Sequence, residues 1–132
     1  MLHRDIIGLS TKGGLSFIDI TADVAGIVQR SGVKEGTCSV FLPATTAGLL
    51  LNEKDRMLLE DFKKLFQSID EKKIYHHPSN AFAHLRASML RSDITFPVSK
   101  GEPRLGAWQS IILWEFDAKP RKRSVTVTVM GE

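Results

Sequence analysis

The chain has 132 residues, 42% hydrophobic and 25% charged, a composition typical of a globular protein that folds as one domain, here residues 1–132. Its formal net charge of +3 is small, and its basic residues are not interleaved with aromatic ones, so we expect no nucleic-acid partner. No apolar run approaches the roughly 20 residues that cross a bilayer, so we expect no membrane partner either.

Two features favour a cytoplasmic protein. The N-terminal stretch carries Asp5 where a signal peptide would have its apolar segment. The single cysteine, Cys38, rules out an intrachain disulfide, which fits a reducing compartment. Because Cys38 lies within an apolar strand pattern, we expect a buried and unreactive thiol.

The N-terminal region predicts two strands and a helix. Residues 2–10 and 14–20 are strand patterns joined by a glycine turn. A helix over residues 22–32 follows, with Thr21 as its N-cap and Gly32 as its stop.

The middle of the chain holds the clearest helix. Residues 37–43 form a strand pattern, whereas residues 46–51 fit either a strand or a turn of helix. Residues 54–69 form an amphipathic helix with an apolar stripe that we expect in the core: Leu58, Phe62, Leu65, Phe66 and Ile69.

The second half predicts one more helix and three strands. The helix begins near Asn80, and Phe82, Leu85 and Met89 share its apolar face. The strand patterns cover residues 93–98, stopped by Pro97, then residues 106–116 and 124–131. The second of these is apolar on both alternations, as in a central strand covered on both faces. Together the elements predict an α+β fold, a largely antiparallel two-layer β-sandwich with helices.

Three of the four histidines, His76, His77 and His84, lie within residues 75–87. His77 and His84 are candidate metal ligands, yet their seven-residue spacing matches no zinc motif. No spacing rule selects a third donor among Glu53, Asp61, Cys38 and His76. The alternatives are proton transfer, for which a reference pKa near 6.5 is suited, and solvated loop residues.

Three other groups of residues have both a structural and a functional interpretation. Asn52 and Glu53 could start the long helix, or Glu53 could act as a general base or metal ligand. Trp108 could stack on a flat ligand that Gln109 orients, or it could fill the core. The basic segment 119–123, with Arg121 and Arg123, is typical of a solvated strand connection, or it contacts a phosphate.

Four stretches in this order resemble one family. They are GTCSVFLPATTAGLLLNE (36–53), YHHPSNAFAHLRASML (75–90), GEPRLGAWQSIILWEFD (101–117) and RKRSVTVTVMG (121–131). Their order and spacing are similar to those of the YjbQ family (UPF0047), also called secondary thiamine-phosphate synthase enzymes. The resemblance covers nearly the whole chain.

The resemblance implies a homotrimer and, in some members, a weak thiamine-phosphate synthase activity. That reaction joins a thiazole phosphate to a pyrimidine pyrophosphate and releases pyrophosphate, normally with magnesium. The implied catalytic residues are His77, His84 and Glu53, with zinc or magnesium as a possible cofactor. The implied substrate-binding residues are Asn52, Asn80, Trp108, Gln109, Arg121 and Arg123. A homotrimer would also explain how so short a chain covers both faces of the doubly apolar strand.

The sequence departs from the family pattern at four places. Ala44 stands where the pattern has a histidine, Pro78-Ser79 replaces an acid and a glycine, and Phe82 replaces a carboxylate. The loop before Arg121 is one residue longer. Because one imidazole of a three-histidine set is gone, we expect His77 and His84 to serve as pocket residues rather than as a complete zinc site.

Two functions therefore remain open. One is a weak thiamine-phosphate synthase that acts on a small phosphorylated ligand. The other is a homotrimeric binding or scaffold protein of the same family whose chemistry has decayed.

Overall fold

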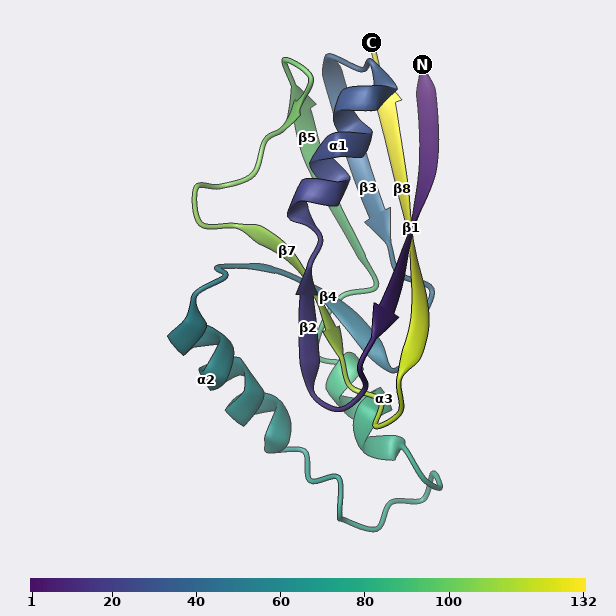
Figure 1. The fold of residues 1–132 in the computed structure, drawn as a ribbon, viewed down its shortest axis with the longest axis vertical. Helices are drawn as coiled ribbons and strands as arrows, with labels where there is room; N and C mark the ends of the chain where they lie inside the picture. The colour runs from purple at the N-terminus through teal and green to yellow at the C-terminus, as the bar shows by residue number, and fades with distance from the viewer.

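The computed structural model describes residues 1–132 and contains two antiparallel sheets with three helices (Figure 1). The strands are β1 (Leu2–Thr11), β2 (Ser16–Asp19), β3 (Glu35–Phe41), β4 (Ala47–Asn52), β5 (Asp93–Ser99), β6 (Glu102–Pro103), β7 (Ser110–Glu115) and β8 (Arg121–Gly131). The helices are α1 (Thr21–Ser31), α2 (Arg56–Gln67) and α3 (Ala81–Ala87). The predicted α+β fold with antiparallel layers is confirmed.

The five-stranded sheet has the order β1-β8-β3-β5-β6, and the three-stranded sheet has the order β2-β7-β4. The two predicted N-terminal strands exist, but they join different sheets, because β1 pairs with β8 and β2 pairs with β7. The glycine turn between them is tightly packed: a Cβ on Gly13, whose φ is +80°, would lie 2.5 Å from the backbone carbonyl carbon of Lys119. A side chain at Gly13 would push this turn away from the backbone of residues 118–120, so glycine is required.

Helix α1 begins one residue earlier than predicted, so Thr21 lies inside it and Ile20 is the N-cap. Thr21 still organises the helix start, since its backbone N–H and its hydroxyl both donate to Asp19 Oδ1, at 2.9 and 2.6 Å. Those bonds hold the pKa of Asp19 below its ordinary value, although burial acts in the opposite direction. Gly32 ends the helix with φ 76°, as predicted.

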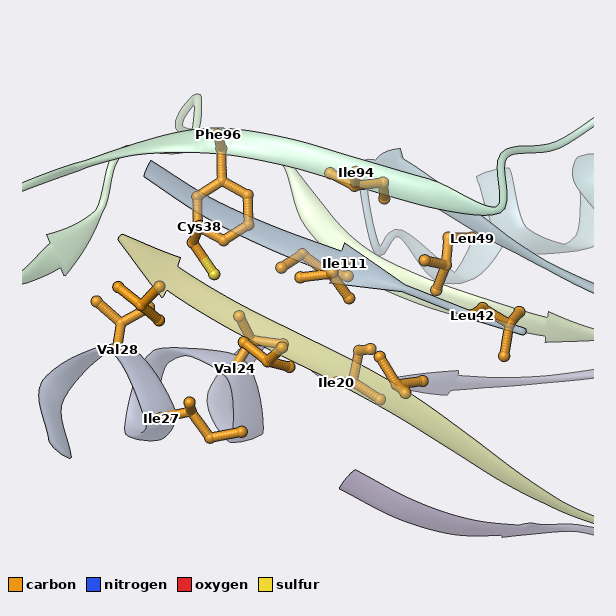
Figure 2. Packing of buried hydrophobic residues seen from close by; sticks show 14 of the residues in the cluster. Ile20, Val24, Ile27, Val28, Cys38, Leu42, Leu49, Ile94, Phe96 and Ile111 are labelled. Carbon is orange, nitrogen blue, oxygen red and sulfur yellow. The ribbon is translucent and has the colours of Figure 1, made fainter. Parts of the chain in front are cut away.

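The main core lies between the five-stranded sheet, helix α1 and one face of the smaller sheet. Figure 2 shows how Val24 and Val28 of α1 approach side chains of the large sheet such as Cys38 and Phe96. Cys38 is fully buried, and desolvation raises the pKa of its thiol to about 12, which confirms the expected inert cysteine.

Strand β7 is covered on both faces within one chain. Ile111 and Leu113 belong to the main core, whereas Ile112 and Trp114 belong to a second cluster under α2 and α3. The predicted central strand is therefore confirmed. A homotrimer is not needed to explain how this strand is covered, because the larger sheet and α1 cover one face and α2 and α3 cover the other within the same chain.

Both helices of the second cluster differ in detail from the prediction. In α2, Leu59 and Phe66 are buried, whereas Leu65 of the predicted stripe is 48% exposed. Helix α3 has only seven residues and buries Phe82, but it leaves Leu85 43% exposed, and Met89, which is 45% exposed, lies beyond its end. Periodicity therefore predicted most of the buried face of α2, since Phe62, Phe66 and, just beyond the helix, Ile69 belong to or pack against the second cluster. It was wrong for Leu65.

Pro97 does not stop its strand, contrary to the prediction, because β5 continues to Ser99. The carbonyl of Pro97 accepts a hydrogen bond from Arg104 N at 2.8 Å, on the side away from β3. In an extended strand the nitrogen of the same residue faces that side too, so the missing N–H costs no bond to β3.

The two termini lie together at one end of the molecule, opposite α3 (Figure 1). The N-terminal ammonium donates to the carbonyl of Gly131 at 2.9 Å. None of the helices is both long enough and apolar enough to cross a membrane.

Candidate functional site

The loop before α3 and the first turn of α3 bring two of the predicted histidines into contact. The rings of His77 and His84 meet edge to face, with centroids 4.9 Å apart. Asn80 begins the helix, and its carbonyl accepts from the backbone N–H of His84 at 3.4 Å. His76 is exposed and takes no part in this ring contact. The two histidines that we expect to be pocket residues are therefore in contact with each other.

The histidine pair borders a small apolar depression, which we call the apolar hollow. It has a volume of about 230 Å³ and is lined by Tyr75, His77, Ala81, His84 and Leu85. Tyr75 is held by its hydroxyl, which donates to the carbonyl of Asp70 at 2.7 Å. The hollow is open to solvent on a surface that also exposes Ile74.

His84 also borders a second depression, which we call the polar hollow. It has a volume of about 400 Å³. Its lining comes from the β3–β4 loop, α3 and β8: Pro43, Ala44, Thr45, Thr46, Asn80, His84, Arg121 and Arg123. Four predicted site residues, Asn80, His84, Arg121 and Arg123, therefore share one surface. A larger hollow of about 660 Å³ lies between α1 and residues 100–105, and none of the predicted site residues lines it.

A buried ion pair forms the floor of the polar hollow. Arg123 Nε and Nη2 donate to the two carboxylate oxygens of Glu115 at 2.8 and 2.5 Å, and Nη2 also donates to Thr46 Oγ1 at 2.8 Å. Glu115 accepts further bonds from Thr11 Oγ1 and the backbone N–H of Asp117. Burial alone would raise the pKa of Glu115, but these bonds outweigh it and lower that pKa. Arg123 therefore uses its Nε and Nη2 for bonds within the chain and has a structural role.

Arg121 has a different environment and stays accessible. Its Nε and Nη2 donate to Asp117 Oδ2 at 2.9 and 2.5 Å, while its side chain is 47% exposed and that of Asp117 only 5%. Burial tends to raise the pKa of Asp117, and the hydrogen bonds and charge of Arg121 lower it overall. The predicted solvated turn is therefore wrong for these two arginines, which lie within β8. Nη1 of Arg121 makes no hydrogen bond within the chain and can contact a ligand.

The other predicted site residues lie at the far end of the smaller sheet. Asn52 is the last residue of β4 and pairs with Ser110, the first residue of β7. Strand β4 starts at Ala47, beside the polar hollow, and five steps of about 3.3 Å separate its ends by about 17 Å. Asn52 and Glu53, together with Trp108 and Gln109, therefore cannot reach the histidine pair of the same chain.

Two structural interpretations of these distant residues are wrong. Asn52 does not cap α2, because Asp55 is the N-cap and its carboxylate accepts from Leu58 N at 2.9 Å. Trp108 does not fill the core, since it is 75% exposed. It stands on a closed turn, residues 106–109, in which Gln109 Oε1 accepts from Gly106 N at 2.8 Å and Gln109 N donates to Gly106 O at 3.1 Å.

The donors present do not suit a tightly held divalent ion. No group of three or more His, Cys, Asp or Glu side chains converges anywhere in the chain. The histidine pair supplies two donors, where catalytic zinc takes three from the protein. Ala44, the residue that replaces a histidine in the family pattern, lines the polar hollow beside His84. A full metal set is therefore one side chain short, and we derive no chemical step through a metal.

Sequence reasoning missed the residues that hold this region together. Glu115 is the only acid within the apolar run of β7, and such an isolated acid signals a buried charge that needs a cation. Thr46 and Thr11 carried no comparable signal, since threonine is common on strand surfaces. Arg86 was missed as well: it is buried, and its Nε and Nη2 donate to the carbonyls of Phe66 and Ile69 at the end of α2.

The fold and the hollows define a class of protein: a two-sheet antiparallel α+β domain with a histidine pair beside an arginine-lined depression. The family described as UPF0047 protein YjbQ-like matches residues 5–132. The chain belongs to this family, as the sequence motifs predicted.

Similar proteins support the same assignment. A UPF0047 protein of Methanothermobacter thermautotrophicus is 36% identical over 135 residues, covering 99% of this chain and 94% of the relative. One of Archaeoglobus fulgidus is 38% identical over 126 residues, covering 92% and 97%. The crystal structure of a YbjQ-like protein from Sulfolobus solfataricus has a TM-score of 0.95 at 35% identity and covers 100% of this chain and 99% of its own.

Proposed function

We propose that the polar hollow binds a small phosphorylated ligand and that the chain carries a weak thiamine-phosphate synthase activity there. One observation carries the proposal: His84 contacts His77 and also lines the polar hollow, which the exposed Arg121 lines as well. Imidazole and guanidinium groups are suited to phosphate oxygens because both donate charged or polar hydrogen bonds. The family resemblance supplies the particular reaction.

The proposed reaction requires charge stabilisation more than base catalysis. The thiazole nitrogen uses its lone pair to form a bond to the methylene carbon of the pyrimidine, and the bond from that carbon to the pyrophosphate oxygen breaks. The electron pair of the broken bond leaves with pyrophosphate, so the side chains must stabilise added negative charge. Preorganised donors provide that kind of stabilisation in a transition state.

Each group at the hollow has a role in this proposal. Arg121 offers its free Nη1 to the pyrophosphate. His84 donates a proton or a hydrogen bond to the leaving oxygen, and His77 orients the ring of His84 through their edge contact. Asn80, on the same rim, can donate its amide to the ligand. Arg123 acts as a positioning residue, because it fixes Thr46 and the β3–β4 loop.

A direct assay tests this proposal. Purified protein is incubated with the thiazole phosphate and the pyrimidine pyrophosphate, and thiamine phosphate is quantified. We expect His84→Ala to lower the turnover at least 100-fold, as expected for the loss of an acid–base group. His76→Ala is the matched control, since that histidine is exposed and outside both hollows. Unchanged turnover in His84→Ala would sink the proposal.

A second candidate is a binding or scaffold protein with decayed chemistry. Ala44 lines the polar hollow without a donor, and the aromatic Phe82 is buried where the family pattern has a carboxylate. This alternative predicts that pyrophosphate still binds, measured by calorimetry, while no thiamine phosphate forms. Arg121→Ala should then weaken the binding although no turnover exists to lose. We propose for either function that the protein assembles as a homotrimer.

A further inference from the structure

The residues of the proposed site form two separate groups on one chain. One group surrounds the two hollows, and the other lies at the far ends of β4 and β7, about 17 Å away along the strand. In Figure 1 the second group lies where the chain enters β7 at mid-height, whereas α3 is at the lower end of the molecule. A single chain therefore presents two separate parts of the proposed site, and neither part is complete by itself.

The far group carries a rigid aromatic anchor. Residues 106–109 form a turn closed by two hydrogen bonds, which we call the tryptophan turn. It holds Trp108 in solvent with 75% of its surface exposed. An exposed tryptophan on a preformed turn loses little conformational freedom on binding, and tryptophan is the side chain most enriched among interface hot spots.

The near group offers an apolar receptor for such an anchor. The apolar hollow has almost no polar lining apart from its two imidazole rings, and the half-exposed Leu85 continues it along α3. Met89 follows just beyond the end of α3 and is 45% exposed. A surface of this kind favours an aromatic side chain over a charged ligand.

The charges of the two groups are complementary. Glu53 lies at the end of β4 beside the tryptophan turn and makes no ion pair within its own chain, although Lys54 next to it pairs with Asp19. The rim of the polar hollow presents the exposed part of Arg121. A contact that brings the two ends together would give Glu53 the cation that it lacks.

We propose that the tryptophan turn of one copy of this chain docks into the apolar hollow of a second copy. The contact is heterologous, since two different surfaces meet, and repeated contacts of this type close into a ring. It places Glu53 and Gln109 of one copy beside His77, His84 and Arg121 of the next. The site is then shared between copies. This deepens the proposed function, on which its chemistry rests, but the contact itself is testable without any activity.

Thiol cross-linking between copies tests the contact directly. Ala107→Cys puts a thiol in the tryptophan turn, and Ser88→Cys puts one at the C-cap of α3, four residues after His84. Cys38 is fully buried and does not interfere. With a short bis-maleimide, the double variant should give a ladder of linked chains that stops at the ring size. A mixture of the two single variants should stop at linked pairs.

A matched control uses a thiol on the uncovered face of the large sheet. Ala107→Cys combined with Met130→Cys should give no ladder, because Met130 is exposed and pairs with Leu2 at the end of β8 that lies by the chain termini, opposite α3. A ladder of equal intensity in this control would overturn the proposal, since it would show random collision. The absence of a ladder in the Ala107→Cys/Ser88→Cys variant would overturn it as well.

Native mass and analytical ultracentrifugation give an independent measurement. Trp108→Ala should leave the fold intact, as circular dichroism can verify, because the side chain is exposed in the single chain. It should weaken the association about 30-fold or more, the effect of losing one hot spot. A wild-type protein that is monomeric, or a Trp108→Ala variant that associates as tightly as wild type, would refute the contact.

These outcomes separate the contact from the chemistry. Cross-linking as expected together with no thiamine phosphate refutes the proposed activity but leaves the shared interface established. Turnover by a monomeric protein refutes the shared site and leaves the activity established.

Discussion

The buried pair of Glu115 and Arg123 gives the sharpest stability prediction. Glu115 accepts four hydrogen bonds, two from Arg123 and one each from Thr11 and Asp117 N. In Glu115→Gln the amide nitrogen must replace one carboxylate oxygen and then faces a donor. At the same time the guanidinium of Arg123, whose side chain is only 9% exposed, loses its counter-charge.

The size of the effect follows from this geometry. Breaking a buried ion pair by neutralising one partner costs about 3–5 kcal/mol, because the remaining charge stays buried without compensation. An unfolding entropy of about 2.1 cal/mol/K per residue gives about 0.28 kcal/mol/K for the 132 residues. We therefore expect the midpoint of thermal unfolding to fall by about 11–18 °C.

Thermal and urea denaturation followed by circular dichroism measure this change. Glu102→Gln is the matched control, since Glu102 is exposed and in no ion pair, and it should shift stability by less than about 0.5 kcal/mol. A double variant, Glu115→Gln with Arg123→Met, should recover part of the loss because no unpaired charge remains buried. If Glu115→Gln behaved like the Glu102 control, the assignment of the pair as a buried determinant of stability would be refuted.

Three further predictions concern pH, backbone strain and metal binding. The pKa values of Glu115 and Asp117 in the folded protein lie below the ordinary 4.5 and 3.8. Their contribution to stability is therefore complete above those ordinary values and is lost as the pH falls through the lower folded values. Urea titrations at several pH values should show the unfolding free energy decrease over that acidic range, and a flat profile would contradict this. Ser79 has φ 71°, so Ser79→Gly should stabilise the chain by about 0.5–1 kcal/mol in the same assay, whereas Ser79→Ala should not. Ala44→His adds a third imidazole beside the histidine pair and should raise zinc affinity at least tenfold in a competition titration. Ala22→His, on the exposed side of α1 and outside the polar hollow, is the control, and an Ala44→His variant that binds zinc no more tightly than the wild type would mean that the site cannot converge on an ion.

The sequence was most informative where side-chain patterns reflect burial directly. The doubly apolar run of β7 and the alternation of Val125, Val127 and Val129 in β8 both predicted strands that the structure contains. Gly32 ended its helix as predicted, because few other residues tolerate its positive φ. These features depend on local conformation and on one buried face, which a short window of sequence contains.

The candidate site was harder to predict because it depends on strand direction and length. The family motifs imply that Asn52 and His84 belong to the same site. In the fold, however, β4 runs away from α3, so Asn52 lies at the opposite end of the smaller sheet. The exposure of Trp108 depends on the side-chain bond from Gln109 that closes its turn. The Glu115–Arg123 pair requires the β7–β8 connection to align two charges, and no periodicity encodes that alignment.

The adjacent termini have a practical consequence for experiments. Since both ends of the chain lie at the opposite end from α3, an affinity tag on either end stays clear of both hollows (Figure 1). The same proximity makes the chain a candidate for circular permutation: a short linker can join residue 132 to residue 1, and new ends can open in the exposed segment at residues 71–74. Such a permutant would free the loop that carries His77 from its covalent connection to α2 while leaving both sheets continuous.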